Sequence, residues 1–250
     1  MRMSYKDVKK GIDSKSQRKN KGFREGGRGL AIITIDGPAG AGKSTVSQML
    51  ARRLRYLYLD TGAMYRAVAL MVLKEKIDPG DERALEKLCK EIVISFSGDS
   101  RGQRIICQGE DVTEKIREPE VSWMASTVSM KRPVREAMVA LQRKIGDRGG
   151  LVAEGRDTGT VVFPQAEGKF FLVADPRERA LRRFRELKAK GNEAKVEEVE
   201  EEVRKRDDQD SSRDLAPLRP AEDAHLIDST GLSPEEVVER MLEVLRGPPS

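Results

Sequence analysis

Cysteine and histidine are scarce in this 250-residue chain, which has two cysteines, Cys89 and Cys107, and one histidine, His225. The cysteines have no paired spacing, which argues against a disulfide framework. The same scarcity argues against a Cys/His zinc site and against a Ser-His-Asp triad. We interpret the cysteines as small buried apolar side chains. His225 precedes an apolar pair, and we interpret it as structural.

Long apolar runs are also missing, since no window approaches 18 uninterrupted apolar residues. This excludes a membrane-spanning helix. The N-terminus lacks the apolar stretch of a secretory signal, so we expect a cytoplasmic protein. Hydrophobic residues make up 38% of the chain, enough for one substantial core and a small satellite domain. No long apolar seam suggests an obligate partner, and we expect a monomer.

Positive charge is concentrated at the start of the chain. Residues 1–28 contain ten Lys and Arg but three Asp and Glu, a net charge of +7. The remaining residues carry a net charge of −2, because the whole chain has a net charge of +5. We expect residues 1–28 to be a disordered basic tail, since they have too few apolar residues to offset the entropy of ordering. We expect no nucleic-acid partner except through this tail.

The rest of the chain alternates between strand and helix patterns. Apolar and β-branched residues at 30–35 predict a central parallel strand, and an apolar helical stripe follows a glycine-rich turn. A second strand is predicted at 56–60 and a second helix at 63–74. Further strands are predicted at 151–153 and 170–173, and helices follow the capping patterns at Asp175 and Ser233. The order indicates an α/β fold with a doubly wound parallel sheet.

One segment has a different pattern. Two short strand candidates, 92–96 and 104–107, are separated by a turn-forming run, which predicts an antiparallel hairpin. We therefore expect a small inserted subdomain at 88–127, with the core formed by 29–87 and 128–250.

A phosphate-binding loop is the strongest local signal. Residues 37–44, Gly-Pro-Ala-Gly-Ala-Gly-Lys-Ser, match G-x-x-x-x-G-K-[ST] in full, between a predicted strand and a predicted helix. Glycines let backbone N–H groups turn towards phosphate, and the helix start adds its positive dipole end. Lys43 is placed to bridge the β- and γ-phosphates, and the Ser44 hydroxyl to bind Mg²⁺. The residues expected to bind ATP are Gly37, Pro38, Ala39, Gly40, Ala41, Gly42, Lys43, Ser44 and Thr45.

The loop alone does not specify a reaction. The chain has no Asn-Lys-x-Asp motif for guanine, and its D-x-x-G match at 228–231 lies too near the C-terminus for a switch loop. The chain is also short for a motor ATPase. These observations favour a kinase that phosphorylates a small molecule or a nucleotide.

Three further segments supply cations for a phosphorylated acceptor. Residues 60–66 and 154–157 follow predicted strands, at the sheet edge where doubly wound folds bind ligands. In the third, Arg206, Asp210 and Arg213 are four and three residues apart, so they would extend an apolar stripe along one helical face. From spacing alone, a solvated ladder of ion pairs remains the alternative interpretation of this face.

The combination of these segments resembles bacterial cytidylate kinases, members of the nucleoside monophosphate kinase family. The resemblance is carried by the loop at 37–44, by residues 60–66, 155–164 and 206–208, and by Ala-Pro-Leu at 216–218. It implies an inserted monophosphate-binding domain and a short lid at 178–192. It also implies Mg²⁺-dependent transfer of the γ-phosphoryl group of ATP to CMP or dCMP.

The resemblance also assigns roles by position. Lys43 and Arg156, with the lid arginines Arg182 and Arg183, match catalytic residues. Those that match CMP-binding positions are Thr61, Tyr65, Arg66, Arg135, Arg156, Asp157, Arg206, Asp210 and Arg213. The chemistry of cytosine agrees, because its amino group needs a carboxylate and its N3 and O2 atoms need donors. Asp157 can supply the first, and Arg135 and Thr61 the second.

Alternatives remain at this point. A related kinase could act on UMP or another small acceptor, and a binding protein could retain the loop without catalysis. The lack of a catalytic histidine is no objection, since the CMP phosphate is already largely ionised near neutral pH and needs no general base. Glu154, which ends a predicted strand, could orient a Mg²⁺-bound water or could be a plain strand-end acid.

Overall fold

The computed structural model describes residues 31–99, 102–189, 191 and 193–247. The expected tail at 1–28 lies outside the described residues, as do positions 190 and 192 of the expected lid segment. The described residues divide into two compact units, one formed by 31–59 with 148–247 and the other by 60–147. The expected insert at 88–127 lies within the second unit, which begins earlier and ends later in the chain.

The first unit is built around a five-stranded sheet. Its strand order is β2 (Leu57–Asp60), β6 (Leu151–Gly155), β1 (Ile32–Asp36), β7 (Gly168–Val173) and β8 (His225–Asp228). β1 pairs in parallel with both β6 and β7, and β7 pairs in parallel with β8. The predicted α/β fold with a parallel sheet is confirmed, and β1 occupies the central position, as its apolar sequence predicts.

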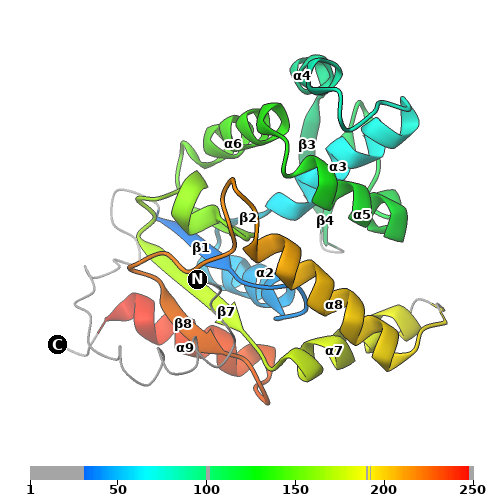
Figure 1. Cartoon of the computed structure of the whole chain (residues 1–250). Helices are drawn as coiled ribbons and strands as arrows, with labels where there is room; N and C mark the ends of the chain where they lie inside the picture. Colours follow the sequence, from blue (N-terminus) through cyan, green and yellow to red (C-terminus); the bar gives the residue numbers. More distant parts are fainter. Residues whose placement is uncertain (1–30, 100–101, 190, 192, 248–250) are drawn as a thin grey trace. The chain divides into compact units, whose positions relative to one another are not determined.

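Alternate residues of the strands face two different layers. Ile33 and Ile35 of β1 and Phe170 and Leu172 of β7 pack in one cluster with helices α2 (Lys43–Leu54) and α9 (Pro234–Arg246). The intervening Phe171 and Val173 pack on the other face, in a cluster with Leu218, Ala224 and Leu226. Figure 1 shows α9, in red, alongside β8. Burial of both faces explains the near-continuous apolar sequence of these strands.

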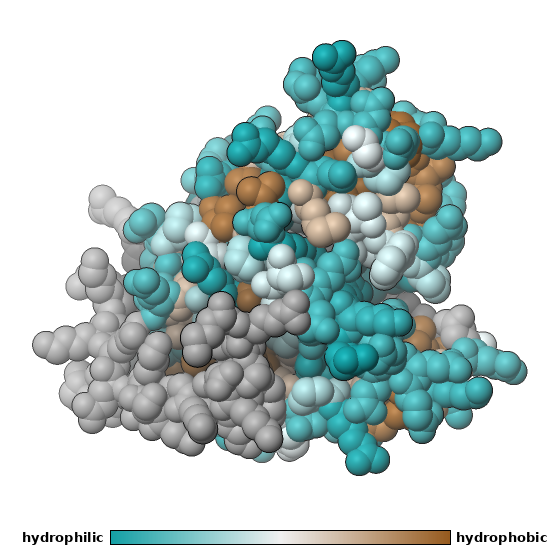
Figure 2. Space-filling model, in the orientation of Figure 1, coloured by the Kyte–Doolittle hydropathy of each residue, from teal (hydrophilic) through white to brown (hydrophobic). Residues whose placement is uncertain are grey.

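Two helices follow β7 and lie side by side (Figure 1). They are α7 (Pro176–Ala189) and α8 (Val196–Ser211), joined by an apolar cluster of Ala180, Val199 and Val203. Asp175 caps α7, since its Oδ1 accepts from the backbone N–H of Arg177 at 2.9 Å. The outward surface of α8 is mainly hydrophilic (Figure 2), in keeping with its many charged residues. The paired helices thus bury one apolar stripe and leave the charged side to water.

The predicted capping pattern at Ser233 is confirmed. The Ser233 hydroxyl accepts from the backbone N–H of Glu236, and the Glu236 carboxylate accepts from the backbone N–H of Ser233. This reciprocal pair satisfies two backbone donors that the first turn of α9 would otherwise leave without partners.

The second unit contains four helices and a small antiparallel sheet among its described residues. The helices are α3 (Thr61–Lys74), α4 (Glu82–Glu91), α5 (Pro119–Val128) and α6 (Arg132–Gly146), and a 3₁₀ turn, η1, covers Lys115–Arg117. The strands are β3 (Ile94–Asp99), β4 (Gly102–Cys107) and β5 (Glu110–Asp111). β3 and β4 pair antiparallel, so the predicted hairpin is confirmed.

The surroundings of the two cysteines and the histidine fit the packing roles that the sequence predicts for them. Cys107 is buried in β4 and Cys89 is half-buried in α4. Burial raises the pKa of the Cys89 thiol to about 11 and also raises that of Cys107, so both are protonated near neutral pH. His225 lies in β8, with its ring centre 6.0 Å from that of Phe170. These positions agree with packing roles.

Candidate active site

The loop at residues 37–42 joins the central strand β1 to α2. Gly37, Gly40 and Gly42 all have positive φ angles, and a Cβ at Gly37 would lie 2.0 Å from the carbonyl oxygen of Leu172. α2 begins at Lys43, and no side chain of the described residues caps its N-terminus. Uncapped N–H groups at a helix start form a binding site for an anion. The geometry expected of a phosphate-binding loop is therefore present.

The carbonyl groups of this loop are held by cationic and hydroxyl donors. Lys43 Nζ donates to the Pro38 carbonyl at 2.7 Å, and Arg179 Nη1 donates to the Ala39 carbonyl at 3.0 Å. The Ser229 hydroxyl donates to the Ala41 carbonyl at 3.1 Å. Three of the loop's acceptors thus have fixed donors, which fixes the peptide planes and leaves N–H groups for the ligand.

Lys43 is buried, and its surroundings alter its charge. Burial lowers the pKa of the Lys43 ammonium, and the nearby Arg156 lowers it further. Carboxylates of Glu154, Asp210 and Asp36 offset part of this effect, and the resulting pKa is about 7. The lysine therefore lies among both the cations and the anions of the site, and a bound polyphosphate would favour its protonated form.

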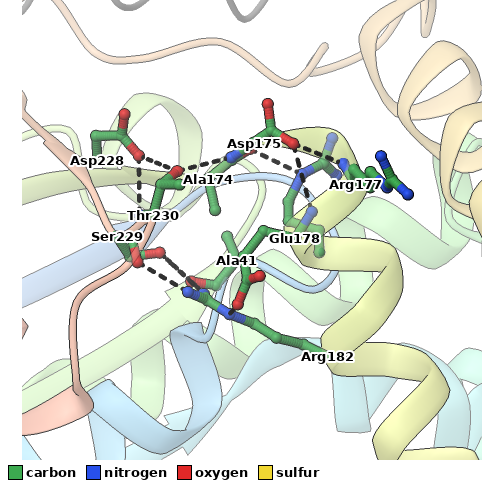
Figure 3. A network of polar contacts seen from close by, with 10 residues as sticks. Ala41, Ala174, Asp175, Arg177, Glu178, Arg182, Asp228, Ser229 and Thr230 are labelled. Carbon is green, nitrogen blue, oxygen red and sulfur yellow. Dashed lines mark hydrogen bonds and ion pairs between the residues drawn. The ribbon is translucent and has the colours of Figure 1, made fainter.

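A loop after β8 fixes the phosphate-binding loop to the start of α7 (Figure 3). Arg182 Nη1 donates to the Ser229 hydroxyl at 3.0 Å, and Arg182 Nη2 to the Ser229 carbonyl at 2.8 Å. Thr230 Oγ1 accepts from the backbone N–H of Asp175 at 2.9 Å. Residues 228–231, which match D-x-x-G, thus anchor the phosphate-binding loop and the start of α7.

The two expected lid arginines differ in their contacts. Arg182 Nε donates to Glu178 at 3.1 Å, besides its contacts with Ser229, and it also approaches the Ala41 carbonyl at 3.5 Å. Arg183 pairs with Glu186 at 3.3 Å along α7. Arg182 thus adjoins the phosphate-binding loop in this conformation, whereas Arg183 makes a local pair on the same helix.

A short π-helix, η2 (Thr158–Val162), follows β6 and carries Asp157 at its start. Asp36, at the end of β1, holds it in place. Asp36 Oδ1 accepts from Thr158 N at 2.9 Å and Thr158 Oγ1 at 2.7 Å, and its Oδ2 accepts from Gly159 N at 2.8 Å. Burial raises the pKa of Asp36, although these hydrogen bonds act in the opposite direction. Asp36 lies immediately before the glycine-rich motif and is not part of any motif that the sequence shows.

A buried charge cluster lies in the same unit. Asp210 is 1% exposed and accepts from Arg156 Nε at 2.6 Å, and it also pairs with Arg213. Burial would raise the pKa of Asp210, but Arg156, Arg213 and Arg206 outweigh it and the pKa is lowered. Burial likewise disfavours the cationic form of Arg156, but nearby carboxylates, Asp210 foremost, raise its pKa. The alternative of a solvated ladder is wrong for these residues.

One detail of the helical prediction needs correction. α8 ends at Ser211, so Arg213 lies beyond the helix instead of on its face. Ser212 leaves the helical conformation at φ −95° and ψ 5°, and Arg213 reaches back to the Asp210 carboxylate. The two side chains still meet, because the turn after α8 brings Arg213 back to the residue three positions before it. Arg213 Nε is buried and has no hydrogen-bond partner among the described residues.

Glu154 lies at the end of β6 and is 3% exposed. The Tyr58 hydroxyl, from β2, donates to the Glu154 carboxylate. Glu154 also raises the pKa of Lys43, so it lies within electrostatic reach of that ammonium. That Glu154 orients a Mg²⁺-bound water stays a prediction.

The second unit holds the other four residues expected at the CMP site. Asp60 caps α3 by accepting from Ala63 N at 2.9 Å, and it pairs with Arg66 Nη2 at 2.9 Å. Arg66 Nε is buried and has no hydrogen-bond partner in the described part of the chain. A second cation, Arg135, is also buried, and its guanidinium lies over the Tyr65 ring at 6.0 Å. Thr61 is buried in the first turn of α3.

The fold and this site together define a class. A phosphate-binding loop between the central strand and its helix, in the same unit as the ion pairs of buried Asp210 with Arg156 and Arg213, is the construction of a P-loop kinase for phosphorylated small molecules. A family model described as Cytidylate kinase matches residues 33–247. The chain belongs to the cytidylate kinase family and is thus a nucleoside monophosphate kinase. The family identified from the sequence motifs is confirmed.

Curated relatives have similar lengths. The chain is 51% identical over 214 residues to a cytidylate kinase of Syntrophotalea carbinolica, covering 86% of this chain and 91% of the relative. It is 52% identical over 213 residues to one of Carboxydothermus hydrogenoformans, covering 85% and 96%. A cytidylate kinase of Enterococcus faecalis is 50% identical over 218 residues, covering 87% of this chain and 96% of the relative.

Within the described residues, no helix has the length and apolar character needed to cross a bilayer.

Proposed function

We propose that this protein transfers the γ-phosphoryl group of ATP to CMP or dCMP by in-line displacement. The observation that supports it most directly is the cluster of Arg156 and Arg213 around the buried Asp210, because the charges of Arg156 and Asp210 act on Lys43 of the phosphate-binding loop. Phosphoryl transfer between two nucleotides requires such a juxtaposition, because both partners are polyanions and must be aligned. The attacking CMP phosphate oxygen is already ionised and needs no base.

The loop residues would hold the donor. Backbone N–H groups of residues 40–44 would surround the β-phosphate, and Lys43 would bridge the β- and γ-phosphates. Arg182 and Arg183 would neutralise charge on the transferring group, a contribution that reaches about 10³–10⁵ in rate in well-studied phosphoryl transfer. Arg182 would have to exchange its bonds with Ser229 for bonds with phosphate. Its position next to the Ala41 carbonyl makes this exchange a short movement.

The remaining residues would hold the acceptor. Arg66, Arg156 and Arg206 would bind its phosphate, and Asp210 and Arg213 would act on its phosphate and sugar. The unpartnered Nε groups of Arg66 and Arg213 support this assignment, since a buried N–H without an acceptor is costly unless a ligand supplies one. We assign cytosine recognition to Asp157, Arg135 and Thr61. A uracil carbonyl facing the Asp157 carboxylate would be poorly paired.

The donor set also fits Mg²⁺. Ser44 lies exposed in the first turn of α2, directly after Lys43, and offers a hydroxyl oxygen. Mg²⁺ prefers oxygen ligands and retains several waters, so one hydroxyl and the phosphates of ATP are a sufficient set. When bound, the ion neutralises phosphate charge and favours an in-line geometry. Glu154 would orient one of its waters, and Tyr58 would hold Glu154 in position.

The test is an acceptor panel in a coupled assay of ADP release. The purified protein is assayed with MgATP and CMP, dCMP, UMP or AMP at equal concentrations. We expect kcat/KM for CMP and dCMP to exceed that for UMP and AMP by at least about 10-fold, the discrimination that one well-paired base edge provides. Preferential turnover of UMP or AMP would overturn the base assignment. No turnover with any acceptor would overturn the proposed function.

A further inference from the structure

Arg179 is a buried arginine that neither the sequence motifs nor the proposed mechanism uses. It lies in the first turn of α7 and is 4% exposed. Its three guanidinium nitrogens contact three different segments. Nε donates to the carbonyl of Ala174 at 3.1 Å, Nη1 to the carbonyl of Ala39 at 3.0 Å, and Nη2 pairs with Asp207 Oδ2 at 2.6 Å. These segments are the end of β7, the phosphate-binding loop and α8.

Arg179 contacts the phosphate-binding loop through its backbone as well as through its side chain. A Cβ at Gly40 would lie 3.0 Å from the Arg179 carbonyl oxygen and 3.1 Å from its Cβ. Backbone of the loop and backbone of α7 therefore touch, and the Arg179 side chain holds the adjoining carbonyl. The loop cannot shift relative to the start of α7 without breaking this packing.

The contact with α8 is equally defined. Asp207 Oδ1 has no hydrogen-bond partner within the described segments, so the bond from Arg179 is the one that fixes this carboxylate. Asp207 follows Arg206 directly and precedes Asp210 by three residues, and its charge also reaches Arg156. The last turns of α8, which carry the proposed acceptor residues, are therefore tied to α7 at this point. Farther along, apolar packing of Ala180 with Val199 and Val203 joins the same two helices.

We propose that Arg179 is a positioning residue for phosphoryl transfer, which sets the distance between the donor's phosphate-binding loop and the acceptor-binding end of α8. It touches neither substrate in this proposal and acts through Ala39 on one side and Asp207 on the other. Because buried guanidinium N–H groups must keep their acceptors, the three segments are held in one relative position. In-line transfer is sensitive to that position, since a displacement of about 1 Å can cost on the order of 100-fold in rate. The proposal rests on the proposed function.

The decisive variant is Asp207→Asn, which keeps the size of the side chain and leaves the contacts of Arg179 with Ala39 and Ala174 in place. We expect kcat with CMP and MgATP to fall about 10-fold to 100-fold, because α8 loses its charged tie to Arg179. We expect KM for ATP to stay within about 2-fold, because the phosphate-binding loop is untouched. Glu201→Gln is the matched control, since it removes an exposed pair with Arg204 on the same helix and should leave kcat unchanged.

A double-variant cycle separates positioning from general destabilisation. Arg179→Met should lower kcat at least as much as Asp207→Asn, and the double variant should be no slower than Arg179→Met, because both changes remove the same tie. Circular dichroism at the assay temperature establishes that each variant is folded, and if Arg179→Met is not folded, Asp207→Asn with its control decides alone. The proposal would be overturned if Asp207→Asn kept the wild-type kcat, or if its KM for ATP rose as much as its kcat fell. It would also be overturned if the loss of kcat in the double variant equalled the product of the two single losses. Failure of the proposed function is distinguishable, because then the wild type itself would not phosphorylate CMP.

Discussion

The charge of the Lys43 ammonium depends on where the residue lies in the fold. Its ammonium group is enclosed by the phosphate-binding loop and donates to the Pro38 carbonyl at 2.7 Å. Burial lowers its pKa to about 7, despite three nearby carboxylates. Free lysine has a pKa near 10.4 and is always charged under the same conditions. Lys43 is therefore partly neutral at physiological pH in the free protein, and a bound polyphosphate favours its charged form.

This leads to a prediction about proton uptake. At pH 8, Lys43 is mainly neutral in the free protein, and the phosphates of ATP raise its pKa again. Binding of MgATP should therefore take up roughly 0.9 proton, and the affinity should weaken as pH rises above about 7. Calorimetric titration in buffers of different ionisation enthalpy measures the uptake. Lys43→Met is the control and should show none, whereas a wild type that binds ATP at pH 8 without proton uptake would contradict the lowered pKa.

At the level of elements, β1 and the π-helix η2 are joined by one carboxylate. Asp36 ends the strand that precedes the phosphate-binding loop, and its two oxygens accept three hydrogen bonds from the first residues of η2. Gly159 permits this approach, since a Cβ there would lie 2.8 Å from Thr34 Oγ1. The donor loop and the segment that carries Asp157 are thus fixed to one strand end.

Asp36→Asn is expected to loosen this connection. An amide retains one acceptor oxygen but places an NH₂ group opposite a backbone N–H, so one buried donor loses its acceptor. The free energy of unfolding should fall by about 1–3 kcal/mol, and KM for CMP should rise more than KM for ATP, because Asp157 is displaced. Urea denaturation and steady-state kinetics measure the two effects. Thr158→Ser, which keeps the hydroxyl, should resemble the wild type, and an unchanged KM for CMP in Asp36→Asn would argue against this link.

At the scale of the whole molecule, charged residues that face water differ in role from those that are buried. α8 presents charged residues to water (Figure 2), where exposed pairs such as Arg204 with Glu201 contribute little to stability. In contrast, Asp210 and Arg179 are buried, and they form ion pairs with the half-buried Arg156 and Asp207. Burying such charges costs free energy of solvation and is weak evidence for stability. Their retention in the first unit agrees with a protein that must bind two polyanionic ligands.

Ligand binding should accordingly stabilise the protein as a whole. A ligand that binds only the folded state at 100 times its Kd adds about 2.7 kcal/mol to the free energy of unfolding. We expect this gain from CMP with the wild type in thermal denaturation. Asp157→Asn should need about 10-fold more CMP for the same rise in Tm, with its response to MgATP unchanged. Equal losses of response to both ligands would count against a role in recognising the base.

Sequence patterns determined much of this protein without any structure. The central strand, the phosphate-binding loop and its helix follow from local chemistry, because a run of β-branched residues, three glycines at positive φ and an unobstructed helix start each depend on adjacent residues. The hairpin at 92–107 and the Ser233 cap were predictable for the same reason. The spacing of Arg206, Asp210 and Arg213 predicted one shared helical face, but the helix ends at Ser211 and Arg213 meets Asp210 from the following turn.

Tertiary structure alone decided which charges are buried together. Asp36 and Thr158 are 122 residues apart, and Arg179 reaches Ala39 across 140 residues. No local pattern distinguishes Arg179 from Arg182 or Arg183, which follow it on the same helix. A side chain's burial and partners depend on which strands and helices the fold brings together, and so does the pKa of Lys43. The sequence thus determined the elements and the family, whereas packing decided which arginine touches which loop, because such contacts join segments that are distant along the chain.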